Sequence, residues 1–228
     1  MVDPETWYHS LPKFVKYYGT VCFLLAVIAS LELGLNIGYL TLDWGSIIHR
    51  LHVWRVLTNF FVLGKFGMGF VFYLYLLTKY VGLLEGHEIY RNKTVDFYYV
   101  VAVMAAGLLV AQFLFLPLPV LSHSLIFGLF YYWSKLEMET PLTIMGFMIK
   151  AYQLPFAVMI IMILLGDSPI KEIAGLIIGH VFYFVKEIVP DKYGTTYLET
   201  PEWFKKFFPN ERQEAAWASF GGRGNVAN

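Results

Sequence analysis

Long runs of apolar residues, separated by short polar or proline-containing breaks, dominate the hydropathy pattern of this chain. A membrane-spanning helix needs about 20 mainly apolar residues, which is close to the length of each run. Pro117 and Pro119 separate the third run from the fourth, and Gly166 and Pro169 lie between the fifth and the sixth. Such residues break helices. The pattern therefore predicts transmembrane helices over six ranges: roughly Tyr17–Leu35, Gly67–Leu84, Phe97–Leu116, Pro119–Leu136, Ile144–Leu165 and Ile170–Val189.

This arrangement predicts an all-α membrane protein in which residues 17–189 form a six-helix bundle. The first loop, residues 36–66, is too polar to span the bilayer but is rich in aromatic and aliphatic residues, so we expect it at the lumenal membrane interface. Residues 1–16 form a short N-terminal segment, and residues 190–228 form a polar tail. Within the tail, residues 201–209 mix aromatic residues with lysines, which favours a position on the membrane surface.

The composition agrees with a membrane protein and excludes several other classes. Hydrophobic residues make up 57% of the chain and charged residues 15%, against about 45–50% and roughly 25% in soluble domains. The formal net charge is zero, which argues against nucleic-acid binding, because that needs a basic surface. The single cysteine, Cys22, cannot form an internal disulfide and is expected to pack as a small apolar residue. We expect no cleaved signal peptide, no cofactor and no metal.

The distribution of basic residues predicts the orientation. Cytosolic loops of membrane proteins carry an excess of lysine and arginine. With the N-terminus in the cytosol, eleven such residues near the spans lie on the cytosolic side and four on the other, so both termini are predicted to be cytosolic. The cytosolic set is Lys13, Lys16, Lys79, Arg91, Lys93, Lys135, Lys150, Lys186, Lys192, Lys205 and Lys206, and the opposite set is Arg50, Arg55, Lys65 and Lys171.

Several short motifs carry a family resemblance. Trp54 and Arg55 form a pair in the long first loop, where the arginine can donate up to five hydrogen bonds and pin an irregular segment. A generic interfacial anchor is the simpler alternative for this pair. The other motifs are Lys150-Ala-Tyr-Gln-Leu-Pro155, the string from Glu172 to Phe184, and Thr200-Pro-Glu-Trp-Phe204. Together they resemble the derlin branch of the rhomboid-like superfamily, from Pro12 to Pro209.

The resemblance to rhomboids raises the question of proteolysis. Rhomboid proteases use a serine in span 4, within Gly-x-Ser, and a histidine in span 6. Ser122 falls at the nucleophile position, but Val120 replaces the glycine. Glu172 stands where the histidine is needed, and His180 lies eight residues further along, about 12 Å away on a helix. Residues 66–84 also contain no histidine or asparagine as an oxyanion donor. We therefore predict a catalytically inactive rhomboid-like protein, with an active intramembrane serine protease as the alternative.

Polar and small residues within the spans are the remaining candidate site. Gly175 and Gly179 are four apart, so they lie on one helix face and permit close helix packing. His180 is interpreted either as a polar side chain bonded to a neighbouring helix or as a wall of a substrate path. The positions expected to pack helices or to line a lateral groove in a thinned bilayer are Gln112, Ser122, Ser124, Gly175, Gly179 and His180.

The resemblance also implies partners. Phe220, Gly222 and Gly224 resemble the short box by which derlin tails bind the AAA unfoldase valosin-containing protein; a disordered glycine-rich tail is the alternative. The implied function is non-catalytic: assisting the retrotranslocation of misfolded proteins in endoplasmic-reticulum-associated degradation, together with a ubiquitin-ligase membrane complex. A homo- or hetero-oligomer and a plastid-surrounding membrane remain open. A small-molecule transporter is disfavoured, because no inverted repeat is recognisable.

Overall fold

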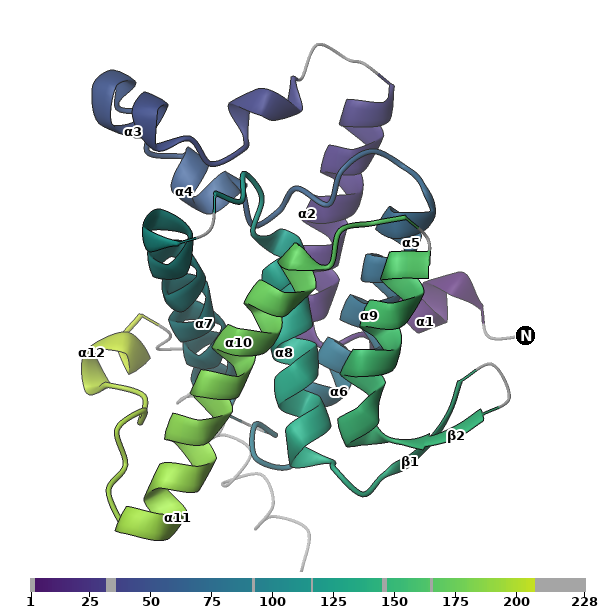
Figure 1. The fold of residues 1–228 in the computed structure, drawn as a ribbon, viewed down its shortest axis with the longest axis vertical. Helices are drawn as coiled ribbons and strands as arrows, with labels where there is room; N and C mark the ends of the chain where they lie inside the picture. The colour runs from purple at the N-terminus through teal and green to yellow at the C-terminus, as the bar shows by residue number, and fades with distance from the viewer. Residues whose placement is uncertain are drawn as a thin grey trace, which may run out of the picture.

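The computed structural model describes residues 3–31, 36–91, 93–115, 117–144, 147–164 and 166–207. The chain is almost entirely helical in these ranges, and its long helices run roughly side by side (Figure 1). The α-helices are α1 (Pro4–Ser10), α2 (Lys13–Ser30), α3 (Trp44–Arg50), α4 (Arg55–Thr58), α5 (Met68–Leu76), α6 (Gly82–Glu85), α7 (Thr94–Leu114), α8 (Ser122–Leu136), α9 (Leu154–Leu164), α10 (Ile170–Tyr183), α11 (Val189–Tyr193) and α12 (Glu202–Lys205). Short 3₁₀ segments are η1 (Ile37–Tyr39) and η3 (Ala151–Gln153), and π-helical segments are η2 (Leu77–Val81) and η4 (Phe184–Ile188).

The all-α membrane architecture is confirmed. Among the described residues, four continuous helices are long and apolar enough to cross a membrane: Lys13–Ser30, Met68–Glu85, Thr94–Leu114 and Ile170–Tyr193. They correspond to predicted spans 1, 2, 3 and 6. Spans 4 and 5 correspond to α8, with 15 residues, and to the continuous helix Ala151–Leu164 formed by η3 and α9, with 14, so both are shorter.

The start of predicted span 5 needs correction. Ile144 does not begin a helix; it ends strand β1 (Pro141–Ile144), which pairs antiparallel with β2 (Phe147–Lys150). The apolar residues of this segment resemble the start of a membrane helix, yet a hairpin satisfies the backbone groups by pairing across strands. The helix begins only at Ala151, with the turn η3 that leads into α9, so the apolar run is divided between a hairpin and a helix.

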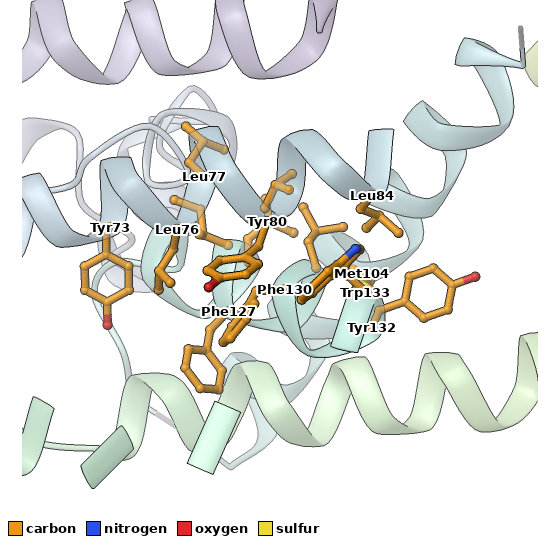
Figure 2. Packing of buried hydrophobic residues seen from close by; sticks show 14 of the residues in the cluster. Tyr73, Leu76, Leu77, Tyr80, Leu84, Met104, Phe127, Phe130, Tyr132 and Trp133 are labelled. Carbon is orange, nitrogen blue, oxygen red and sulfur yellow. The ribbon is translucent and has the colours of Figure 1, made fainter. Parts of the chain in front are cut away.

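Helix α8 forms the centre of the bundle. It packs against α10, α7, α9 and α5, and nearly all of its side chains are buried. In Figure 2, Phe127, Phe130 and Trp133 of α8 interleave with side chains of the α5–η2–α6 span, such as Leu76 and Tyr80. Cys22 is fully buried and unpaired, as expected of a small apolar residue.

Glu85 fastens the start of α2 to the end of the second span. Its two carboxylate oxygens accept hydrogen bonds from the backbone amides of Phe14 (2.8 Å) and Val15 (3.1 Å). These amides belong to the first turn of α2, whose N–H groups have no partner within the helix and whose dipole favours a negative charge. A carboxylate from a distant helix therefore caps α2, in a position where Pro12 offers no side-chain cap.

Candidate functional site

The interface between α8 and α10 is built on glycines. A Cβ atom at Gly175 would overlap the carbonyl oxygen of Ser124 and lie 3.0 Å from the amide nitrogen of Gly128. A Cβ atom at Gly179 would lie 2.7 Å from the carbonyl oxygen of Gly128. The two backbones therefore approach so closely that no side chain fits between them, which is the packing mode typical of small residues four apart in membrane helices.

Ser122 and Ser124, at the start of α8, are fully buried, and both donate hydrogen bonds to backbone carbonyls. Ser122 donates to the carbonyl of Val62 in the first loop, and Ser124 donates to the carbonyl of Lys171 at 2.7 Å. In the isolated chain these two side chains join segments of the bundle and do not line an open surface. Ser122 thus ties the first loop to the central helix.

An imidazole also approaches Ser122 from the next residue of α8. The Nδ1 atom of His123 lies 3.4 Å from the Ser122 hydroxyl. This distance exceeds the reach of about 2.6–3.2 Å typical of a nucleophile and its base, and the hydroxyl donates to Val62 instead. The His123 ring stacks edge-on against Tyr73, with a distance of 4.4 Å between ring centroids. His123 therefore packs against the second span.

Glu172, which the sequence predicts to replace the histidine of rhomboid proteases, lies in the first turn of α10. Its side chain is fully buried in α10, and its Oε1 atom accepts a hydrogen bond from the hydroxyl of Tyr73 in α5. Its Oε2 atom has no hydrogen-bond partner among the described residues. The Tyr73–Glu172 contact joins spans 2 and 6 across the bundle. No sequence signal singles out Tyr73, because a tyrosine in an apolar run has the composition of an ordinary membrane residue.

His180 lies on α10 one residue beyond Gly179. Its Nδ1 atom is 2.8 Å from the hydroxyl of Tyr131 on α8, yet its side chain is exposed on the outer surface of the chain. The structure thus combines features of both interpretations: a bond to a neighbouring helix, and a polar group that the chain does not cover. A polar side chain in a membrane helix needs a hydrogen-bond partner, and the Tyr131 hydroxyl supplies one for His180.

An ion pair lies at the N-terminal end of α10, directly after the fifth span. Asp167 accepts a hydrogen bond from the ammonium group of Lys171 at 2.9 Å. Burial raises the pKa of Asp167, but the hydrogen bond and positive charge of Lys171 outweigh this effect, and the pKa lies below its usual value. The two side chains of this pair therefore both carry a charge, just before and at the start of the sixth span.

At the opposite end of the bundle, a second polar network joins residues that no sequence motif connects. The Tyr132 hydroxyl donates to Glu187 at 2.7 Å and is 2.8 Å from the Tyr90 hydroxyl. These residues come from α8, from the π-helical segment η4 and from the loop before α7. Their spacing follows no pattern, so only the fold could reveal the network.

The two residues of the predicted loop signature, Trp54 and Arg55, differ in their surroundings. Arg55 is buried, and its Nη1 atom donates to the carbonyls of Gly38 (2.6 Å) and Thr41 (2.8 Å). Trp54 is 47% exposed and stacks against His52. Arg55 therefore holds the irregular loop together, whereas Trp54 faces outward as an interfacial aromatic residue would.

Gln112 also belongs to the anchoring of the first loop. Near the end of α7, its side-chain oxygen accepts a hydrogen bond from the indole N–H of Trp44 in α3. Trp44 further packs edge-on against Phe113, at 5.1 Å between ring centroids. The amide of Leu42 donates to the carbonyl of Pro119 at 2.7 Å. These contacts fasten the loop to the connection between spans 3 and 4.

The tail candidates Phe220, Gly222 and Gly224 lie outside the described residues. Before them, α12 packs on α7 through an edge-on contact between Phe204 and Tyr99 (5.4 Å). Its aromatic neighbours Trp203 and Phe207 are largely exposed. In the described part of the chain, no group of three or more histidine, cysteine or acidic side chains is placed to hold a metal ion.

Comparison with known proteins identifies the family. The model of the Der1-like family matches residues 11–202. Derlin-1.1 of Zea mays is 32% identical over 213 residues, covering 90% of this chain and 85% of that protein. Derlin-1 of Arabidopsis thaliana is 32% identical over 228 residues, covering 99% and 85%. Derlin-2.1 of Zea mays is 29% identical over 218 residues, covering 91% and 87%. This helical membrane protein, similar to derlins over most of its length, belongs to the Der1-like family.

Proposed function

We propose that this chain assists the retrotranslocation of misfolded proteins through the endoplasmic reticulum membrane by thinning the bilayer beside α9. Membership of the Der1-like family supports a role in endoplasmic-reticulum-associated degradation. The finer mechanism depends on how the chain meets the lipid, because a polar polypeptide crosses a thin or wet region at lower cost than an intact hydrocarbon core.

The length of the fifth span is the observation that carries this mechanism. The turn η3 and α9 form one helix, Ala151–Leu164, whose 14 described residues extend roughly 22 Å, against a hydrocarbon core of about 30 Å. Ile160 and Leu164 face outward, at 58% and 80% exposed. Lys150 before the helix is paired with Glu139, and Asp167 after it is paired with Lys171, so charges lie close to both ends. A short apolar surface of this kind is matched by thinning of the bilayer.

The opposite flank supplies a contrast within the same molecule. Helix α7 has 21 residues and extends roughly 31 Å, which matches an ordinary bilayer. The proposed thinning is therefore local to the α9 side. The exposed imidazole of His180, bonded to Tyr131, supports a wet path on the surface of the bundle.

Spin labels can measure this asymmetry. In a Cys22→Ala background, a label at position 160 on the outer face of α9 is compared with one at position 106 on the exposed face of α7. Because α9 spans less hydrocarbon, we expect the label at 160 to be more accessible to a polar nickel reagent, relative to oxygen, than the label at 106. Equal relative accessibility at the two positions would show a bilayer of uniform thickness and contradict the mechanism.

We also infer that the chain extracts proteins without cleaving them. The hydrogen bond from Ser122 to Val62, and a glutamate where the base is needed, support this inference. We expect Ser122→Ala to retain the degradation of a misfolded lumenal client in cells that depend on this chain. A matched Ser124→Ala variant controls for the loss of a buried hydrogen bond. If Ser122→Ala alone abolishes degradation and peptide cleavage, the chain is an intramembrane protease.

The pulling force is proposed to come from a valosin-containing-protein-type AAA unfoldase bound by the tail. The box of Phe220, Gly222 and Gly224 supports this partner. We expect deletion of residues 218–228, or Phe220→Ala, to remove most of the ATPase from pull-downs, because the aromatic side chain supplies the main apolar contact of a short motif. Trp217→Ala removes an aromatic side chain outside the box and should retain binding. Equal recovery with all variants contradicts the recruitment.

A further inference from the structure

A cavity opens between α1, α2 and the α5–η2 segment. It has a volume of about 350 Å³ and is lined mostly by apolar side chains, including Val15, Phe23 and Leu74. Trp7 and Phe23, which line it, are 47% and 43% exposed, so the cavity opens to the outer surface of the chain. Gly19 forms part of its floor and leaves room that any larger side chain would take.

Helix α1 covers one end of this cavity and is held there by polar contacts. The Tyr8 hydroxyl lies 2.8 Å from the hydroxyl of Thr20, and the Lys16 ammonium donates to the carbonyl of His9 at 3.1 Å. The same ammonium lies 5.7 Å from the centre of the Tyr8 ring. In Figure 1, α1 turns away from the line of α2. The covering segment is thus fixed by specific contacts to α2.

The lining residues favour one kind of occupant. Among the described residues that line the cavity, Lys16 is the one that carries a formal charge, and it uses one of its three N–H groups for His9. An apolar slot with one cationic group at its rim suits a molecule that has a slender apolar chain and an anionic headgroup.

We propose that this cavity binds an anionic phospholipid from the leaflet on the side of the N-terminus. One acyl chain lies over Gly19 between α2 and α5, and the headgroup phosphate meets Lys16 near the membrane surface. A cationic rim above an apolar slot between membrane helices is the arrangement by which such sites recognise anionic lipids. The proposal rests on membrane insertion of the bundle and is independent of the proposed role in retrotranslocation.

Photolabelling tests the site in the full chain. The protein is reconstituted in phosphatidylcholine vesicles that contain a small fraction of phosphatidylserine with a diazirine on its acyl chain, and labelled peptides are mapped by mass spectrometry. We expect several-fold more label on the α2 and α5 residues of the cavity than on outward residues of α7. Phosphatidylcholine carrying the same diazirine should label the cavity less.

Two variants test the binding of the acyl chain and the contact with the headgroup separately. Gly19→Leu fills the floor and should reduce cavity labelling several-fold, whereas Val21→Leu, on the exposed face of the same helix, should not. Lys16→Gln should remove the preference for phosphatidylserine, whereas the same change at the exposed Lys192 should not. The proposal is overturned if folded Gly19→Leu labels normally or if the two lipids label equally. It is also overturned if a photoreactive residue at position 23 captures a second copy of the chain, or a client, in place of lipid.

Discussion

Gly175→Val is expected to destabilise the bundle strongly. The new side chain would enter the backbone-to-backbone contact with Ser124 and Gly128, where even a Cβ atom overlaps neighbouring atoms. Overpacking of a tight interior costs typically 1–3 kcal/mol. The obstacle at this position is backbone that cannot rotate away, so we expect a loss of at least about 3 kcal/mol. Thermal unfolding in detergent, followed by size-exclusion chromatography, measures the effect.

Gly69→Val is the matched control for this substitution. Gly69 also lies in a membrane helix, but a Cβ atom there would meet nothing within 4 Å. Both substitutions replace a helical glycine by the same β-branched residue. The difference in unfolding temperature therefore reports the α8–α10 contact. Equal destabilisation by the two variants would show that the close packing of Gly175 contributes little.

Arg55→Ala is expected to release the first loop from the bundle. The substitution removes the two hydrogen bonds that the guanidinium group donates, and the carbonyls of Gly38 and Thr41 lose this donor. Such bonds contribute roughly 1.5–3 kcal/mol each, so we expect a loss of about 3 kcal/mol in stability. Limited proteolysis should also cut within residues 36–66 several-fold faster, because the loop would no longer be held against the membrane helices.

Two further variants make the interpretation specific. Arg50→Ala removes the same charge from an exposed position in α3 of the same loop and should leave both measurements nearly unchanged. Arg55→Lys keeps the charge but replaces the planar fork by a single ammonium group, so an intermediate effect is expected. If Arg55→Ala behaves like Arg50→Ala, the buried arginine is not the anchor of the loop.

Hydropathy predicted the membrane class and four full-length spans because the bilayer constrains the sequence directly. Each spanning segment must satisfy its own backbone hydrogen bonds and present apolar side chains over about 20 residues. The same reasoning was wrong at Ile144, where apolar residues belong to a hairpin. Hydropathy also did not distinguish α8 and α9 from the longer spans, although their short length supports the proposed thinning.

The candidate site was predicted less completely than the fold. Gly175, Gly179 and Arg55 could be selected because their roles follow from residue chemistry and from spacing within one element. Tyr73 and Glu85 could not, because their partners lie 99 and about 70 positions away in the sequence. A tyrosine or a terminal glutamate in an apolar run has no feature that indicates which distant group it will meet.

The sequence alone determined that this chain is a helical membrane protein, and its motifs pointed to the family, because lipid and short-range spacing leave direct marks on residue order. The tertiary structure decided which helix lies at the centre, which polar groups meet, which side of the bundle is short and where a cavity opens. Those features depend on contacts between segments far apart in the chain, and such contacts exist only after the helices have packed.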